Sequence, residues 1–259
     1  MIGFKAKQLD LKEIDSLETL NKHRSLISKK HYLKSLYKDF YQEILSRLSL
    51  SAKDKVVEIG SGGGFIKEII PFAITSDVRG APGIDMVFNA SQIPFRDESI
   101  DALLMLNVFH HLQNVEICLQ SFDRVLRPGG KIIMVEPTNT PWRRWTDRRF
   151  HNEIFDPLSS WDIGTGGPMS TANGALAWIA LIRDQKILEE KFPNLKVTFI
   201  REHTPFRYFA SGGLSYPQLL PNFTYDGLKI LENSLDPFMK WIAIFQTIEI
   251  TKTTKKKYE

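Results

Sequence analysis

Two stretches of this sequence carry residues whose types and spacing suit ligand binding and catalysis. In Val56–Gly64 an acidic residue, Glu58, precedes glycines at positions 60, 62 and 64. Glycine lets a backbone approach a ligand closely, and the N–H groups at a helix N-terminus attract anions. In Asn107–His111 two adjacent histidines offer side chains that titrate near neutral pH. The first stretch predicts a nucleotide-cofactor site, and the second a candidate base.

Alternating strands and helices are expected to position these groups. Val56–Ile59 is an apolar run typical of a strand, and the apolar residues of Phe65–Ile70 return at helical spacing. Similar runs predict six further strands, at Phe72–Ser76, Ile84–Phe88, Ala102–Leu106, Lys131–Val135, Lys196–Arg201 and Trp241–Thr251. Strands that alternate with helices form a parallel sheet. Because ligands bind beyond the carboxyl ends of such strands, the two stretches are expected to meet there.

Further helices are predicted between the later strands. Asn114–Leu126 is periodic, and Arg127–Gly130 ends it because proline and glycine cannot continue a helix. A second helix is expected at Asn173–Lys191. The single cysteine, Cys118, lies on the apolar stripe of the first helix, so we interpret it as a core residue, and no disulfide framework exists.

The flanking segments predict additions to this sheet. Residues 1–52 are expected to form an N-terminal helical cap, with apolar periodicity from Ile27 to Leu48 and Tyr32, Tyr37 and Tyr41 beside it. That helix either packs on the following domain or covers the active site with a tyrosine facing substrate. Within the domain, residues 53–251, insertions at about 138–170 and 203–240 are too long for ordinary connections. They are candidates for lids or substrate sites, or else pad the surface or form a dimer contact.

The glycine-rich loop and two later segments resemble class I S-adenosylmethionine-dependent methyltransferases. "VVEIGSGGG", "NASQIPFRDESIDALLMLNVFHHL" and "FDRVLRPGGKIIMVEP" have the order and spacing of the type 11 branch, which includes quinone-biosynthesis enzymes. A dinucleotide-binding fold usually has Gly-x-Gly-x-x-Gly instead. The resemblance implies an α/β, Rossmann-like fold with a seven-stranded, mostly parallel sheet whose last strand is antiparallel. The helical cap and both insertions would lie over its active site.

The same resemblance implies which residues bind S-adenosylmethionine. Glu58 would meet the ammonium group of the donor, and Asp77, seventeen residues after the first glycine, would hold the ribose hydroxyls. Asn89 stands where the family usually has aspartate; with Ala90 it would face adenine. The remaining implied contacts are Gly60, Ser61, Gly62 and Gly64 in the loop and Asn107 beside the methionine portion.

The acceptor end is less specific in the sequence. His110 and His111 are candidate bases, although such a pair can simply cap the following helix, and His151 in the first insertion is a second candidate. Glu136, after the fifth strand, could meet substrate. Because the two histidines are adjacent rather than four residues apart, and no cysteine cluster exists, no metal site is expected.

A basic and aromatic segment, Trp142–Arg149, offers a further acceptor contact. If this segment is helical, Arg144 and Arg148 share one face and could grip a phosphate or carboxylate. The alternative is a solvated helix whose arginine stems lie on apolar surface. A nucleic-acid partner is not expected, because one short cluster without a wider basic face supports it poorly.

Composition bounds the class of protein. The chain has 259 residues, a net charge of +4, 42% hydrophobic and 25% charged residues, which is ordinary for a globular protein. No signal sequence and no run of about 20 apolar residues is seen, and residues 252–259 form a basic tail, so a cytoplasmic location is expected. The predicted function is methyl transfer to a small or medium-sized metabolite, at a hydroxyl of a glycan or lipid-linked precursor. The alternatives are a non-catalytic partner or sensor that binds the donor, and a nicotinamide-dependent oxidoreductase.

Overall fold

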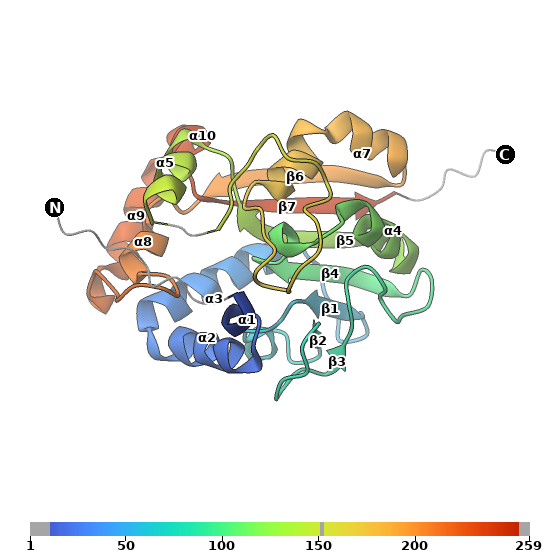
Figure 1. The fold of residues 1–259 in the computed structure, drawn as a ribbon, viewed down its shortest axis with the longest axis horizontal. Helices are drawn as coiled ribbons and strands as arrows, with labels where there is room; N and C mark the ends of the chain where they lie inside the picture. Colours follow the sequence, from blue (N-terminus) through green and yellow to red (C-terminus); the bar gives the residue numbers. More distant parts are fainter. Residues whose placement is uncertain (1–10, 151–152, 254–259) are drawn as a thin grey trace.

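A seven-stranded sheet forms the centre of the molecule. The computed structural model describes residues 11–150 and 153–253, and the strand order is β3-β2-β1-β4-β5-β7-β6 (Figure 1). The strands are β1 Val56–Ile59, β2 Ile74–Asp77, β3 Met86–Val87, β4 Ile100–Leu106, β5 Leu126–Pro137, β6 Leu195–His203 and β7 Phe245–Lys252. The pairs from β3 to β5 are parallel, and β7 is antiparallel to both of its neighbours. The predicted Rossmann-like sheet with an antiparallel last strand is confirmed.

Helices surround the sheet and gather at one end of it, at the left of Figure 1. The α-helices are α1 Leu11–Ile14, α2 Leu17–Lys29, α3 His31–Ser46, α4 Val115–Val125, α5 Pro141–Phe150, α6 Leu176–Trp178, α7 Gln185–Lys191, α8 Arg207–Ser211, α9 Tyr225–Ser234 and α10 Met239–Ile242. Short 3₁₀ turns are η1 Ile66–Glu68, η2 Phe109–His111, η4 Asn222–Thr224 and η5 Asp236–Phe238, and η3 Ile179–Arg183 is a π-helical stretch. None of the helices in the described ranges is both long and apolar enough to cross a bilayer.

The prediction of a helix after the glycine-rich loop is wrong. Only the single turn η1 follows the loop, and Pro71 comes soon after it. Glycine is a poor helix former, and the space beside β1 is already filled, because Tyr41 and Ile44 of α3 belong to the same buried cluster as Ile66. The loop therefore does not present a helix N-terminus to an anion.

Strand boundaries also differ from those predicted. β5 begins at Leu126, five residues early, because Leu126 pairs with Ile100 while Lys131 pairs with Ala102 across a bulge. Gly129 in the bulge has a φ of 80°, which glycine adopts without strain. β2 begins two residues later than expected and includes Asp77, and β7 begins at Phe245. Lys252, expected in a solvated tail, is buried and donates to the carbonyls of Asp123 and Leu126. Residues 254–259 lie outside the described part.

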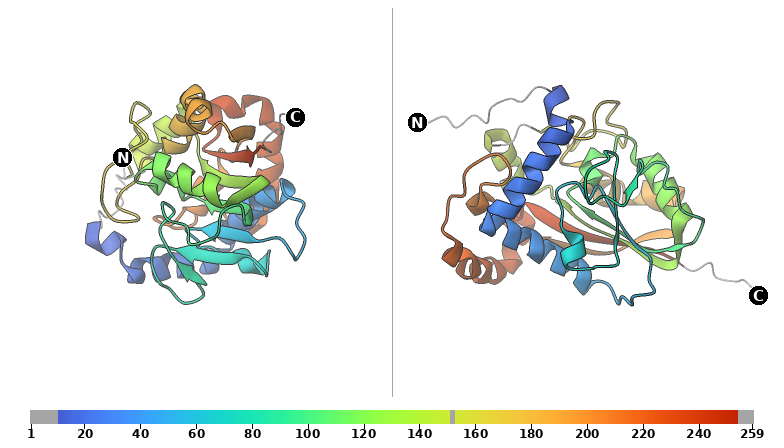
Figure 2. Two further views of the ribbon diagram at one scale, coloured as in Figure 1. Left: turned by 90° about the vertical axis from the view of Figure 1, so that its right-hand side faces the viewer. Right: turned by 90° about the horizontal axis from the view of Figure 1, so that it is seen from below.

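Two buried clusters cover the two faces of the sheet. One joins the strands to α4, α6, η3 and α7, and it includes Cys118, as expected of a core residue. Burial raises the pKa of the Cys118 thiol to about 12. The other cluster joins the strands to α3, whose Leu33, Leu36 and Phe40 are almost fully buried. The N-terminal helices, blue in Figure 2, therefore complete the core of the sheet.

The N-terminal helices are tied to both insertions by polar contacts. Asp15 accepts from the backbone N–H groups of Met169 and Ser170 in the first insertion. Lys30, between α2 and α3, donates to the carbonyls of Gly213 and Tyr216 in the second. Segments far apart in the sequence thus meet above the same end of the sheet.

An ion-pair cluster that contains the buried Arg207 and Glu232 also ties the second insertion to α3. Asp39 on α3 accepts from Arg207 of α8 and, at 2.7 Å, from the Tyr225 hydroxyl of α9. Arg207 also pairs with Glu232, which is 1% exposed and accepts the N–H of Phe206 at 2.8 Å. A buried charge that loses its partner is costly, so this cluster holds the second insertion against α3.

Asp39→Ala is expected to lower the free energy of unfolding by about 3 kcal/mol, because it leaves the Arg207 guanidinium short of a counter-charge. Lys229→Ala removes the more exposed partner of Asp39, at 2.9 Å, and should cost less than about 1 kcal/mol. Urea unfolding of both variants measures the difference. Equal effects would contradict the assigned role of the cluster.

Candidate active site

A cavity of about 700 Å³ lies where the connections of the sheet change direction. β1 and β4 are neighbours, but the chain leaves β1 toward β2 and leaves β4 toward β5, on opposite sides. Open α/β sheets bind ligands at such a point. Residues from the ends of β1, β2 and β4, from α2 and α3, and from both insertions line the cavity. The expectation that cap and insertions overlie the site agrees with this lining.

Close packing restricts the glycine-rich loop to glycine. Gly60 has a φ of 67°, and a Cβ there would lie 2.6 Å from the side chain of Val108. A Cβ on Gly64 would lie 2.2 Å from the Tyr41 hydroxyl of α3. The loop can thus lie close beneath the N-terminal helices, and Ser61, which is buried, and Gly62 also line the cavity.

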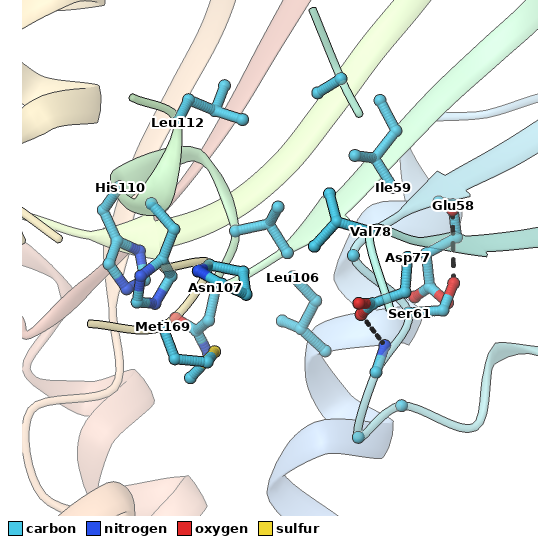
Figure 3. Close-up of a pocket in the computed structure, with 18 of the residues that line it drawn as sticks. Glu58, Ile59, Ser61, Asp77, Val78, Leu106, Asn107, His110, Leu112 and Met169 are labelled. Atoms are coloured by element: carbon cyan, nitrogen blue, oxygen red, sulfur yellow. Dashed lines mark hydrogen bonds between the residues drawn. The ribbon is translucent and has the colours of Figure 1, made fainter. Parts of the chain in front are cut away.

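Asp77 lies at the end of β2 and holds the loop. Its Oδ2 accepts the N–H of Gly62 at 3.1 Å, and its Oδ1 accepts the N–H of Arg79 at 2.9 Å and faces the Arg79 Nε at 3.2 Å (Figure 3). The side chain is 4% exposed and lines the cavity. A carboxylate at this position can accept from vicinal hydroxyls of a ribose.

Glu58 is a buried carboxylate with one oxygen unsatisfied. Oε1 accepts from the Tyr41 hydroxyl at 2.7 Å, whereas Oε2 is buried and has no hydrogen-bond partner among the described residues. Burial raises the pKa of Glu58 to about 7, and the hydrogen bond from Tyr41 opposes this rise only in part. An unpaired buried carboxylate oxygen is costly, and an ammonium group in the cavity would satisfy it. The Glu58 carboxylate therefore fits the ammonium group at the amino-acid end of S-adenosylmethionine.

The other predicted cofactor residues also line this cavity. Asn89 and Ala90 follow β3, and the Asn89 Oδ1 accepts from the N–H and the hydroxyl of Ser91, each at 2.9 Å. Asn107 ends β4 with a φ of 57°, which asparagine tolerates better than most residues. A hydrogen bond joins its side chain to the Tyr37 hydroxyl, whose pKa burial raises to about 12.

His110 and His111 line the opposite end of the cavity, where Figure 3 shows His110 beside Asn107 and Met169. The His110 Nδ1 lies 2.6 Å from the Glu136 Oε2, and the Glu136 Oε1 accepts the N–H groups of Val108 and Phe109, each at 2.7 Å. Burial lowers the pKa of His110, but the Glu136 carboxylate overcomes this and raises it. His111 Nδ1 bonds to the Thr171 carbonyl at 3.1 Å. Burial, followed by the neighbouring His110, lowers the pKa of His111 to about 4.

Several other predicted residues lie elsewhere. Glu136 is fully buried behind His110 and does not line the cavity. Trp142–Arg149 is helical, within α5, but Arg144 donates to Asn139 at 2.9 Å, and neither Arg144 nor Arg148 lines the cavity. His151 lies outside the described residues.

Sequence reasoning missed several other lining side chains, and four of them are charged or polar groups at the site. Arg143 is 4% exposed and pairs with Asp147 at 2.7 Å, and Arg79, Glu153 and Tyr208 come from three different segments. The i, i+4 spacing of Arg143 and Asp147 was the one signal available, since it favours an ion pair on a single helix face.

Comparison with known proteins points to one family. Residues 73–134 match the family described as methyltransferase domain. A phthiotriol/phenolphthiotriol dimycocerosates methyltransferase of Mycobacterium ulcerans is 29% identical over 147 residues, 50% of this chain and 48% of that protein. A ubiquinone/menaquinone biosynthesis C-methyltransferase of Bartonella tribocorum is 37% identical over 65 residues, 24% of this chain and 25% of that protein. The chain thus spans about half, or less, of these curated relatives.

A solved structure supports the same fold over nearly the whole chain. An S-adenosylmethionine-dependent methyltransferase of Thermotoga maritima, described as a possible histamine N-methyltransferase, superposes with a TM-score of 0.57. It covers 92% of this chain and 98% of its own, at 16% identity. The family match over residues 73–134 and the shared fold support a class I S-adenosylmethionine-dependent methyltransferase, with S-adenosylmethionine as the cofactor.

Proposed function

We propose that this chain catalyses methyl transfer from S-adenosylmethionine to a hydroxyl of a small or medium-sized metabolite. The observation that carries the proposal is one cavity with two different ends, a glycine-rich loop with buried acids and a pair of oriented histidines. When bound, S-adenosylmethionine supplies an activated methyl group on a sulfonium sulfur. The protein then needs mainly to align the acceptor, for which proximity alone supplies several kcal/mol.

At the donor end we assign each role to a contact in the cavity. Glu58 binds the ammonium group through its unsatisfied Oε2, and Asp77 binds the ribose hydroxyls while it holds the N–H of Gly62. Asn89 and Ala90 border the adenine, and Asn107 borders the methionine portion. The loop Gly60–Gly64 supplies backbone beneath the donor.

At the acceptor end we assign orientation and activation of the hydroxyl to His110 and His111. Glu136 is a positioning residue, because it holds the Nδ1 of His110 and the backbone of η2 together. Arg143 lines the same region, and its charge suits an acceptor with a phosphate or carboxylate group. This replaces Arg144 and Arg148 as the proposed anion contact and is compatible with a glycan or lipid-linked precursor.

Two alternatives predicted from the sequence have less support. A dinucleotide-dependent oxidoreductase usually seats its pyrophosphate on a helix N-terminus, whereas here only the turn η1 follows the loop. A non-catalytic donor-binding protein would not need an acceptor pocket, but the cavity continues past Asn107 to both histidines and to Met169.

Asp77→Ala should weaken binding of S-adenosylhomocysteine at least about tenfold, because charge-assisted hydrogen bonds to the ribose are lost. Isothermal titration calorimetry measures this, and Asp97→Ala, at a carboxylate whose side chain is 73% exposed, is the matched control. Unchanged affinity in Asp77→Ala would contradict the assignment. If the wild-type protein binds NADH tightly and does not bind S-adenosylhomocysteine, the cofactor is a nicotinamide dinucleotide instead.

The affinity for S-adenosylhomocysteine should rise with pH, because only the ionised Glu58 attracts the ammonium group. With a pKa of about 7, lowering the pH from about 8 to about 6 should weaken binding roughly tenfold. Glu58→Gln should bind weakly and without this pH dependence.

The stability of the ligand-free protein should show the opposite trend with pH. Native Glu58 keeps a proton that the unfolded chain releases near its ordinary pKa of 4.5, so the free energy of unfolding falls as pH rises from there toward 7.

A screen of hydroxyl compounds, with and without anionic groups, for formation of S-adenosylhomocysteine should identify an acceptor. His110→Gln should then lower the rate at least about 100-fold, while its affinity for S-adenosylhomocysteine stays close to that of the wild type. A wild-type rate in the His110→Gln variant would show that His110 does not activate the acceptor. If the protein binds the donor tightly but methylates no compound in the screen, the non-catalytic alternative would be favoured.

A further inference from the structure

The acceptor end of the cavity contains a cluster of three metal-ligating groups. His110, His111 and Glu153 each offer a ligand atom, and these atoms lie within 4.8 Å of one another. The His110 Nε2 is 3.8 Å from the Glu153 Oε2. All three residues line the cavity. Two imidazoles and one carboxylate are a ligand set typical of divalent transition metals such as zinc and iron(II).

Each imidazole is oriented by an oxygen outside the cluster. The Thr171 carbonyl, 3.1 Å from the His111 Nδ1, can only accept, so that nitrogen carries the hydrogen. The Glu136 carboxylate, 2.6 Å from the His110 Nδ1, requires the same of His110. The lone pair of each neutral ring is therefore on Nε2. Metal-binding histidines characteristically donate their other ring N–H to a carboxylate or a backbone carbonyl in this way.

The two histidines are held rigidly. They follow one another in η2, and their ring centroids lie 4.1 Å apart. Glu136, which is fully buried, accepts the N–H groups at the start of η2 as well as the His110 Nδ1. Ligand atoms about 2.1 Å from a tetrahedral zinc ion lie about 3.4 Å from one another. The His110 Nε2 and the Glu153 Oε2, 3.8 Å apart, lie close to that spacing, and the whole group, within 4.8 Å, would contract around an ion by up to about 1.4 Å.

We propose that His110, His111 and Glu153 bind one divalent transition-metal ion and that the acceptor coordinates this ion through its hydroxyl oxygen. The inference rests on the proposed methyl transfer and names the chemistry of its acceptor site. Three protein ligands leave coordination positions open for oxygen ligands. Coordination lowers the pKa of a bound hydroxyl, so its proton leaves to water and the oxygen becomes the nucleophile. The histidines then activate the acceptor as ligands rather than as free bases.

Spacing along the sequence argued against this site because the histidines are adjacent. The third ligand comes instead from Glu153 in the first insertion, which the fold brings to the end of β4. Both histidines belong to the turn η2, and both line the cavity.

Cobalt(II) is a suitable probe, since its visible absorption reports nitrogen ligands and coordination number. The full-length, tag-free chain would be treated with EDTA, dialysed, and titrated with Co²⁺ with and without S-adenosylhomocysteine. We expect one Co²⁺ per chain, displaced by Zn²⁺. Affinity should fall at least about tenfold in His111→Ala and Glu153→Gln, and by about 10- to 100-fold in Glu136→Gln, which loses the outer partner of His110. An acceptor that coordinates the ion should change the Co²⁺ spectrum.

His23→Ala is the matched control, because His23 lines the same cavity from α2 but lies outside the cluster; it should bind Co²⁺ like the wild type. Retained binding of S-adenosylhomocysteine shows that each variant is folded. Absence of stoichiometric Co²⁺ binding by the wild type, or equal binding by His111→Ala and Glu153→Gln, would overturn the metal site. Failure of the methyltransferase proposal would appear separately, as loss of donor binding by the wild type.

Discussion

The divergence of the chain at the ends of β1 and β4 is the constraint on which the site depends. These strands pair in parallel over Val56–Ile59 and Ala102–Met105, so both turns that follow them emerge at one edge of the sheet. One turn packs against Val108 at Gly60 and against Tyr41 of α3 at Gly64, where a Cβ would lie too close to those side chains. The other turn reverses at Asn107 and continues into the histidines. A donor loop and an acceptor turn are adjacent because the strands that precede them are hydrogen-bonded to one another.

Two buried carboxylates at this edge of the sheet, Glu136 and Glu58, differ in how completely their oxygens are hydrogen-bonded. Glu136 is surrounded by donors from the backbone of η2 and from His110, so burial costs it little and its task is to hold those groups. Among the described residues, Glu58 accepts from the Tyr41 hydroxyl on Oε1 and has no hydrogen-bond partner on Oε2. Its raised pKa is the consequence of that deficit. A satisfied buried acid is structural, whereas a deficient one facing a cavity is poised for a cationic ligand.

The N-terminal helices and the two insertions act together rather than as separate additions. Asp15, Lys30 and Asp39 each reach an insertion by hydrogen bonds or ion pairs. α3 also covers the apolar face of the sheet beside β1, the position that a helix after β1 would otherwise occupy. The enclosure of the cavity is thus part of the folded core. α3 packs on the domain, while Leu20 and His23 of α2 line the cavity; a tyrosine that faces substrate stays a prediction.

The sequence by itself determined the sheet, the glycine-rich loop and the residues placed at strand ends, because these follow from local periodicity and from the rule that parallel strands end at one edge. Glu58, Asp77, Asn107 and the histidines could therefore be predicted as site candidates from the sequence and its resemblance, and they line one cavity. It could not reveal that η1 replaces a helix, since that depends on α3 occupying the space. Nor could it show that Arg143 rather than Arg144 faces the cavity, or that Glu153 joins the histidines. Those contacts join segments separated by tens of residues, and only the packing of the insertions decides which side chains meet.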